Sequence, residues 1–244
     1  MADVTSQGVL SAVARKSVGS DSPGTTNLVS WYDITESSGT ISTISDDYST
    51  NDLTTSGSPS GGTTGKWGTT IDWNGSTHYA SSTSTSFDIT GAITLGAWIN
   101  LGTTSDEKIF TKYTYNLNQR GYTFAIQSDK VVLYCSPNGY NPLTGVTGAT
   151  TISSSTWTFV VGVFNPSTEM LVYVNGVEDA SNTTSIPASI FNSNADLLLG
   201  SANGGIDGWI DGLVQSAFIY DRVLTADEIT WLYNSGSGRQ YADL

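Results

Sequence analysis

The segment GGIDGWIDGLVQSAFIY, residues 204–220, holds two aspartates whose chemistry bears directly on function. Asp207 and Asp211 each precede a glycine, and the apolar residues after them predict a β-strand. Such carboxylates can bind calcium, supply half of a catalytic acid pair, or line the polar rim of a β-sandwich. The EF-hand spacing, with acids at alternate positions and a distal Glu, is absent. We therefore expect a structural rim.

A catalytic acid pair would need a second carboxyl group at short range. Retaining glycoside hydrolysis places its two carboxyl groups about 5 Å apart. Asp106 and Glu107 are neighbours in the sequence, so on a strand they would point to opposite faces. Glu169 is expected in a turn and Glu228 at the start of a helix. We therefore expect a protein that is not an enzyme.

Nucleophilic and zinc chemistry find no support in the residue types. The only histidine, His78, lies in STHYA as an expected, partly exposed strand residue, and no G-x-S-x-G nucleophile motif occurs. The only cysteine, Cys135, excludes an internal disulfide. It lies in the strand-like run KVVLYCS, where a buried thiol is expected. One His and one Cys cannot form a zinc cluster.

The composition is that of a turn-rich β protein with a strong negative charge. Of the 244 residues, 38% are hydrophobic and only 13% are charged, while 26 are glycine. The net charge of −13 would repel phosphate backbones, so no nucleic-acid partner is expected. It would attract divalent cations or keep the protein soluble. No apolar run is long enough for a membrane span.

The elements that must position these residues are mostly strands. Residues 1–26 are small and polar and predict an N-terminal arm or linker, and residues 27–244 predict one folded domain. Predicted strands within the domain are NLVSWYDI, WGTTIDW, AITLGAWINL, EKIFTKY, GYTFAIQS, KVVLYCS, TWTFVVGVF and EMLVYVNGV.

Three segments define how these strands pack. In AITLGAWINL, alternate residues share one face of the expected strand, and these are Ile93, Leu95, Ala97, Ile99 and Leu101. TWTFVVGVF is apolar on both faces and predicts a central strand covered on each side, and Asn175-Gly176 predicts a type I′ hairpin after it. TADEITWLYNSG predicts one helix, with Thr225 and Glu228 in capping-box spacing and a stop near Gly236.

These patterns predict an all-β fold, a two-sheet antiparallel sandwich with one short C-terminal helix and an N-terminal arm. The strand residues Trp31, Trp73, Trp98 and Trp157 are expected to pack in its core.

The chain resembles the laminin-G-like jelly rolls of the concanavalin-A-like superfamily, in the variety common in tailed-phage and other bacterial sequences. The matching segments are LVSWYDITESSGT, DDYSTNDLT, GKWGTTIDWNGSTHYA, ITLGAWINL, TWTFVVGVFNPSTEMLVYVNGV, LLLGS, DGLVQSAFIYDRVLTADEI and WLYNSGSGRQYADL. Their order and spacing carry the resemblance. It implies a jelly-roll sandwich whose usual roles are binding and adhesion.

The resemblance also implies a calcium ion at one rim. Asp46 matches the acid of the early D-x-x-G-x-x-x-L segment, although Ser49 replaces the glycine. Gln215 stands where the family usually carries an Asp in a later strand, and its neutral carbonyl is a weaker calcium ligand than a carboxylate. Asp211 lies on the same strand face as Gln215, about 13 Å away. Asp46, Asp211 and Gln215 are the candidate metal ligands, and no cofactor other than calcium is expected.

The family includes glucanases, which carry their acids as Glu-x-Asp-x-Glu or with one residue inserted, a spacing that is absent here. With a glucanase disfavoured, glycan recognition is the role that we expect for this domain. Aromatic side chains in turn-rich segments could stack on sugar rings. These candidates are Tyr48, Tyr113, Tyr115, Tyr140 and Trp209.

The expected function is that of a non-catalytic virion surface protein. Residues 1–20 lack a basic segment followed by an apolar one, the mark of a secretory signal. We expect production in the host cytoplasm and a place on the virion surface, as a capsid decoration or tail-associated protein. The arm, residues 1–26, would dock on a capsid or tail protein, and the sandwich would display its loops to glycans. A homo-oligomer is expected.

Three alternatives remain open from the sequence. The protein could be a free carbohydrate-binding lectin, with or without calcium, that reaches the cell surface or the exterior without the Sec route. It could be a glycoside hydrolase, against the Glu spacing. It could also be a purely structural module that binds only its own copies.

Overall fold

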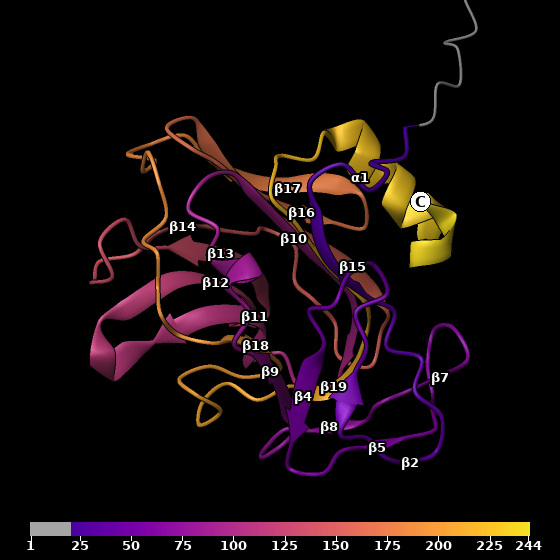
Figure 1. Cartoon of the computed structure of the whole chain (residues 1–244). Coiled ribbons are helices and arrows are strands. Elements are labelled where there is room, and N and C mark those ends of the chain that lie inside the picture. Colours follow the sequence, from indigo (N-terminus) through magenta and orange to yellow (C-terminus); the bar gives the residue numbers. More distant parts are fainter. Residues whose placement is uncertain (1–20) are drawn as a thin grey trace, which may run out of the picture.

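Two antiparallel β-sheets lie face to face in the computed structural model, which describes residues 21–244 (Figure 1). The first sheet has the order β1-β19-β10-β15-β16-β17, with β8 beside β19. Its strands are β1 (Leu28–Tyr32), β8 (Trp73–Asn74), β10 (Ile93–Leu101), β15 (Thr158–Asn165), β16 (Glu169–Val174), β17 (Val177–Asn182) and β19 (Asp211–Tyr220).

The second sheet has the order β14-β13-β12-β11-β18-β9-β4-β3. Its strands are β3 (Thr43–Ile44), β4 (Leu53–Ser56), β9 (Tyr79–Ser82), β11 (Asp106–Thr114), β12 (Gln119–Gln127), β13 (Lys130–Cys135), β14 (Thr144–Thr147) and β18 (Leu197–Leu199). Two short ribbons pair β2 (Gly39–Thr40) with β5 (Ser60–Gly61) and β6 (Thr63–Thr64) with β7 (Thr69–Thr70). The predicted antiparallel sandwich is confirmed.

The main core fills the space between the two sheets. β10 alternates as predicted, so its odd-numbered residues 93–101 belong to this core. The second sheet faces them with Phe124 and Leu133, among others. Cys135 is 1% exposed in the same core, and burial raises the pKa of its thiol to about 12. The expected buried thiol is confirmed.

A second apolar cluster covers the outer face of the first sheet. β15, apolar on both faces as predicted, sends Val160 and Phe164 inward and Phe159 outward. Trp98 of β10 stacks on Tyr233, with ring centroids 5.8 Å apart. The side chains that close this face come from the C-terminal segment and include Leu224, Ile229, Leu232, Tyr241 and Leu244. The first sheet is therefore buried on both sides.

The helix α1 (Ala226–Tyr233) forms this cover and begins as predicted. The Thr225 hydroxyl accepts from the Glu228 N–H, and the Glu228 carboxylate accepts from the Thr225 N–H, which completes the capping box. The helix ends at Tyr233 because Asn234 adopts the left-handed conformation, φ 48°. The expected stop at Gly236 is thus wrong by a few residues. Short 3₁₀ turns are η1 (Thr85–Phe87), η2 (Tyr115–Leu117), η3 (Asn234–Gly236) and η4 (Tyr241–Asp243).

Three of the four tryptophans expected in the core are buried there or under the helix. Trp73 belongs to the core between the sheets, and Trp31 and Trp98 to the outer cluster. Trp157 is different: it precedes β15, is only half-buried and packs at the edge of the outer cluster. Its expected core position is wrong because the strand begins one residue later, at Thr158.

The N-terminal residues that the structure describes lie against the C-terminal segment. The Tyr220 hydroxyl donates to the Gly24 carbonyl (2.8 Å), and the Arg222 guanidinium donates to the Pro23 carbonyl (3.0 Å). Residues 21–26 therefore sit beside α1 and the C-terminus, away from β12 and β13 (Figure 1). The rest of the expected arm, residues 1–20, lies outside the described residues.

In residues 21–244 no helix is long and apolar enough to cross a membrane.

Candidate functional site

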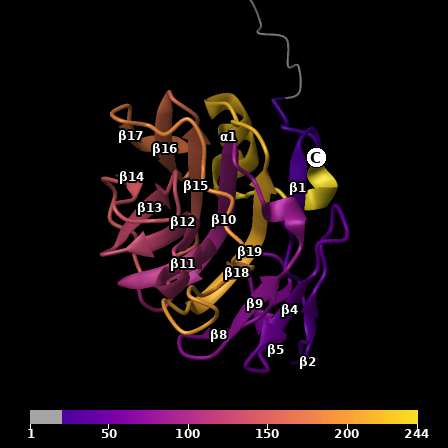
Figure 2. The ribbon, with the colours of Figure 1, turned by 60° about the vertical axis from the view of Figure 1, so that its left-hand side comes forward.

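Within residues 21–244, no helix covers the outer face of the second sheet. Figure 2 shows β11, β12 and β13 side by side on the opposite side of the molecule from the C-terminus. Along β12, Tyr122, Phe124 and Ile126 point into the core, so Thr123 and Ala125 point outward. The residues of β13 alternate in the same way between the core and the outer face, so Val132 and Tyr134 point outward.

A groove of about 330 Å³ runs over this face and is called the main groove here. The buried side chains of Thr123, Ala125 and Val132 lie along its floor. Its full lining is Asp106, Lys108, Tyr113, Thr123, Ala125, Gln127, Val132, Tyr134, Leu143, Ala202 and Asp207. The volume lies at the lower end of the range for small-molecule sites, about 300–1,000 Å³.

The main groove presents polar groups that the protein itself leaves unused. Within residues 21–244, the side chains of Thr123, Gln127 and Asp207 make no hydrogen bond or ion pair. The two half-buried tyrosines, Tyr113 and Tyr134, add aromatic rings whose hydroxyl ends can donate and accept. A floor of small apolar residues with such polar groups around it suits a flat, hydroxyl-rich ligand.

One wall of the groove is the 201–208 loop, which includes the aspartate Asp207 of the opening segment. The loop lies over β11: the Thr111 hydroxyl donates to the Ser201 carbonyl (2.8 Å), and the Lys108 N–H donates to the Gly208 carbonyl (2.9 Å). Gly208 has φ 60°, and a Cβ there would lie 2.5 Å from the Lys108 side chain, so glycine allows the loop to approach β11. Asp207 thus forms part of a groove wall.

Two further predicted ligand-binding residues lie close to Tyr113 of the main groove. They are Tyr115 and Tyr140. The Arg120 guanidinium lies over the Tyr113 and Tyr115 rings, 5.7 and 5.3 Å from their centroids. It also donates to the carbonyl of Gly139, the residue before Tyr140 (3.1 Å). Tyr115 is 51% exposed and Tyr140 54% exposed. Arg120 therefore links the loops that carry Tyr115 and Tyr140.

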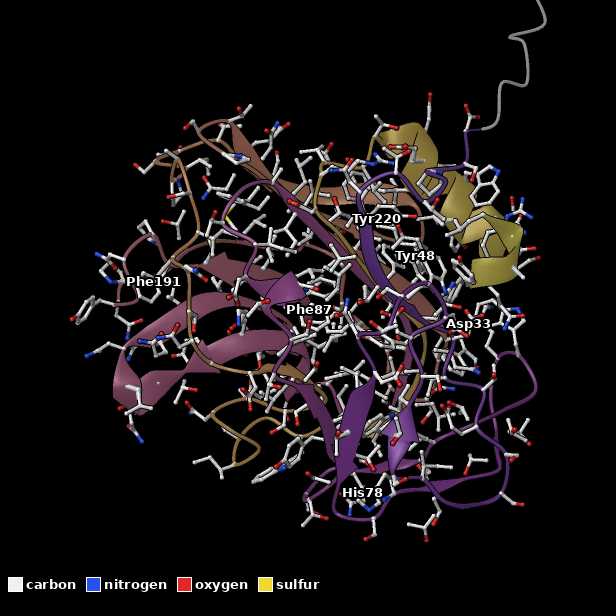
Figure 3. All side chains as sticks on the ribbon, viewed as in Figure 1. Asp33, Tyr48, His78, Phe87, Phe191 and Tyr220 are labelled. Carbon is white, nitrogen blue, oxygen red and sulfur yellow. The ribbon has the colours of Figure 1, made fainter. Side chains whose placement is uncertain are left out.

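Tyr48, the remaining tyrosine candidate, lies elsewhere. Its ring is 6.3 Å from that of Tyr241, in the C-terminal segment. In Figure 3, Tyr48 and Asp33 lie on the side of the C-terminus, whereas Phe191 lies on the opposite side. Phe191 packs beside Gly139, near the Tyr140 loop. Tyr48 is thus separate from the main groove.

Trp209 and Asp211 line another hollow, of about 380 Å³, that adjoins the main groove at Asp106 and is called the acidic hollow here. Its central acid is Glu107, which is 3% exposed. The Glu107 carboxylate accepts from the Thr103 hydroxyl and from the Asp211 N–H (3.0 Å). Burial raises the pKa of Glu107, and the nearby charges of Asp211 and Asp106 act in the same direction.

The three candidate metal ligands make protein contacts at separate places. The Asp46 carboxylate accepts from the Trp31 N–H (3.1 Å), the Tyr48 N–H (3.0 Å) and the Ser49 hydroxyl (2.5 Å). It thereby holds the 45–52 loop onto β1. Asp211 lies at the start of β19, beside Glu107.

Gln215 is fully buried and its side-chain amide is saturated. The carbonyl oxygen accepts from the N–H groups of Lys66 (2.7 Å) and Trp67 (3.2 Å). The amide nitrogen donates to the carbonyls of Trp67 (3.0 Å) and Ile34 (3.2 Å). Residues 21–244 contain no group of three His, Cys, Asp or Glu side chains that could hold a metal ion. Calcium stays a prediction.

Sequence reasoning did not identify Tyr134, Thr123 and Gln127 as groove residues. The signal was present in the alternation of β12 and β13, which places these three on the face opposite Phe124 and Leu133. Using it required knowledge that the two strands are neighbours.

The fold is that of the concanavalin A-like β-sandwiches. Residues 74–230 match the Laminin_G_3 family model, described as the concanavalin A-like lectin/glucanases superfamily. The chain belongs to this family. No curated protein sequence matches the chain.

Several solved structures share the fold at low sequence identity. Domain 4 of AbnA, an extracellular arabinanase from Geobacillus stearothermophilus in complex with arabinotriose, is 19% identical with a TM-score of 0.64, covering 84% of this chain and 97% of that domain. The binding domain of Paraclostridial Mosquitocidal Protein 1 is 16% identical with a TM-score of 0.64, covering 86% of this chain and 52% of its own.

A structure of botulinum neurotoxin type C, whose cell entry depends on two ganglioside molecules, is 14% identical with a TM-score of 0.64. It covers 86% of this chain and 51% of its own. This chain thus spans about half the length of the toxin structures that it matches. At these identities the likeness shows the fold.

Proposed function

We propose that this protein is a non-catalytic glycan-binding module that uses the main groove. The observation that carries the proposal is the convergence of Tyr113 and Tyr134 with the unused polar side chains of Thr123, Gln127 and Asp207 over a sheet surface. Sugar rings combine apolar faces with equatorial hydroxyl groups. A site that offers aromatic rings together with free donors and acceptors can satisfy both.

The acids around the groove support binding without catalysis. Asp106 forms an ion pair with Lys108, which occupies the carboxylate. Glu107, whose pKa is raised, has both carboxylate oxygens engaged in hydrogen bonds and lies in the acidic hollow rather than the main groove. Neither acid is placed as a free general acid opposite a nucleophile.

The comparisons support the same proposal at the level of fold. A domain of an arabinanase with this fold has been solved with arabinotriose, and a toxin structure with this fold is tied to gangliosides. In both cases a protein with a sandwich of this kind interacts with a glycan.

Glycan-array binding with single tyrosine variants tests the proposal. Tyr113→Ala and Tyr134→Ala should each weaken binding to the strongest array ligand by about tenfold, since removing an aromatic anchor commonly costs more than about 1 kcal/mol. Tyr48→Ala is the matched control and should bind as the unmodified protein does. Equal binding by all three variants would contradict the proposal. Release of reducing sugar from any polysaccharide would instead establish a glycoside hydrolase.

A free lectin that needs calcium is the second candidate. It would lose its array binding in a chelator and regain it with calcium. Binding that is unchanged by the chelator leaves the groove as a metal-independent site.

We further propose that the module is displayed on a virion, docked on a capsid or tail protein through residues 1–26. The resemblance to tailed-phage sequences motivates this assignment. Residues 21–26 lie beside the C-terminus and away from the main groove, so an attachment there would leave the groove exposed (Figure 1). Purified particles should lose the protein when residues 1–26 are deleted, and unchanged retention would contradict docking. A mass measurement in solution tests the expected homo-oligomer.

A further inference from the structure

A second pocket lies on the other side of the 201–208 loop from the main groove and is called the side pocket here. It has a volume of about 370 Å³. Thr114 of β11, Gln119 of β12 and Leu198 of β18 line it, together with Leu117, Asn194 and Asp196. Gly204 also lines it, whereas Ala202 and Asp207 of the same loop line the main groove. One loop therefore separates the two pockets.

The side pocket resembles the main groove in its chemistry. Over residues 21–244, the side chains of Thr114, Asn194 and Asp196 have no hydrogen-bond or ion-pair partner. The Gln119 carbonyl oxygen accepts from the Asn194 N–H (2.8 Å), which leaves its amide N–H groups free to donate. Leu117 is 69% exposed beside these groups. Free donors and acceptors again surround an apolar surface.

β12 joins the two pockets. Gln127, at its C-terminal end, lines the main groove, and Gln119, at its N-terminal end, lines the side pocket. Gln127 and Gln119, at the far ends of the two pockets, are eight residue steps apart, about 27 Å, whereas the near ends adjoin at Tyr113 and Thr114, neighbouring residues of β11. A ligand that fills both pockets from end to end must consist of several linked sugar units.

The charges around the two pockets disfavour an acidic ligand. Asp207 in the main groove and Asp196 in the side pocket carry no counter-ion in the described part of the chain. The cations nearby are engaged: Lys108 pairs with Asp106 and Lys112 with Asp88 (2.8 Å). The guanidinium of Arg120, which is buried, donates to the Asn118 side chain (3.0 Å) and to the Gly139 carbonyl (3.1 Å). A sialic or uronic acid would meet unpaired carboxylates in a protein of net charge −13.

Resting on the glycan-binding function above, we infer that the ligand is an uncharged, chain-like polysaccharide that occupies the main groove and the side pocket together. The Tyr113 and Tyr134 rings anchor one section of the chain. Thr114, Gln119 and Asn194 hydrogen-bond the adjoining section, beyond Tyr113. The 201–208 loop lies between the two sections and contacts the chain from one side.

Binding as a function of oligosaccharide length tests this inference. The probes are oligosaccharide ladders of four neutral polysaccharides (linear arabinan, xylan, mannan and mixed-linkage β-glucan) and two acidic polymers, polygalacturonate and alginate. Affinity for the preferred neutral ladder should rise by about tenfold or more between the disaccharide and the octasaccharide, because two or three added hydrogen bonds suffice for that factor. The acidic polymers should bind more weakly than the neutral ones.

A variant of the side pocket separates this inference from the proposed function. Asn194→Ala combined with Thr114→Ala should lower affinity for the octasaccharide to nearly that of the disaccharide and leave disaccharide binding unchanged. Asn192→Ala, an exposed asparagine of the same segment outside the pocket, is the matched control and should have no effect. Circular dichroism of each variant checks that the fold is kept.

The possible failures are distinguishable. Three results would overturn the inference alone, provided that Tyr134→Ala still weakens binding: affinity that is independent of length, an octasaccharide affinity unaffected by the side-pocket variant, or stronger binding to polygalacturonate or alginate. Binding that is insensitive to Tyr134→Ala, or no binding to any probe, would overturn the proposed function and this inference with it.

Discussion

The two outer faces of the sandwich differ in whether other parts of the chain cover them. The outer face of the first sheet is sealed by α1 and the C-terminal segment over a cluster of aromatic rings that includes Trp31, Trp98, Phe159 and Phe218. The outer face of β11–β13 has no such cover among the described residues and forms the main groove. One face contributes to stability and the other is available to a ligand.

The polar side chains of the two faces show the difference most directly. Gln215, under the β6–β7 ribbon on the first sheet, is fully buried and every polar atom of its amide has a partner. Gln127, on the second sheet, is exposed, and among residues 21–244 its amide has none. A buried amide must be satisfied by the protein, whereas an exposed one is kept available by water. The polar side chains of the main groove are therefore open to water and within reach of a ligand.

The largest expected contrast comes from the aromatic side chains of the two faces. Trp98→Ala should lower the free energy of unfolding by about 3–5 kcal/mol, because it removes a side chain that packs against Trp67, Phe159 and Tyr233. Tyr113→Ala, in the main groove, should cost less than about 1 kcal/mol. Urea unfolding followed by circular dichroism measures both. Similar losses for the two variants would mean that the groove face also stabilises the fold.

Replacing one glutamine on each outer face tests the same contrast between the faces, with a smaller expected change in the free energy of unfolding. Gln215→Leu should cost about 2–3 kcal/mol, because the N–H groups of Lys66 and Trp67 would lose their acceptor inside the protein. Gln127→Leu should change stability by less than about 0.5 kcal/mol, as expected for a surface position. The same unfolding experiment tests this pair, and a loss of equal size at Gln127 would contradict the assignment of its face as open.

The sequence predicted the covered face better than the open one. TWTFVVGVF is apolar at every second position on both faces, and this alone required a cover on each side of β15. The capping box at Thr225 and Glu228 located the helix that supplies the cover. Both signals are local, and local patterns can be read from one sequence.

The main groove depends on contacts between distant segments. Tyr113 is among the predicted ligand-binding residues because it lies in a turn-rich region. Tyr134 lies within an apolar strand, and its alternation identifies a groove residue only once β12 and β13 are known to be neighbours. The 201–208 loop reaches β11 from about 90 residues away through the Thr111–Ser201 hydrogen bond. Trp209 is among the predicted ligand-binding residues because it is an aromatic residue in a turn-rich segment, and it lines the acidic hollow instead of the main groove. No period or spacing in the sequence encodes these contacts.

The smallest expected effect is a pH dependence that originates beside the groove. Burial raises the pKa of Glu107 above its ordinary value of 4.5, so the folded protein holds this proton more tightly than the unfolded chain. The resulting stabilisation is fully present below pH 4.5 and is lost as the pH rises through the pKa of the folded state. Ionisation therefore costs stability at neutral pH.

Glu107→Gln should flatten this part of the stability profile. Urea unfolding midpoints between pH 4.5 and pH 8 should decline less steeply in the variant, because the glutamine stays neutral throughout that range. Glu178→Gln, at an exposed position of β17, is the matched control and should leave the slope unchanged. An unaltered slope in Glu107→Gln would show that Glu107 stays ionised despite its burial.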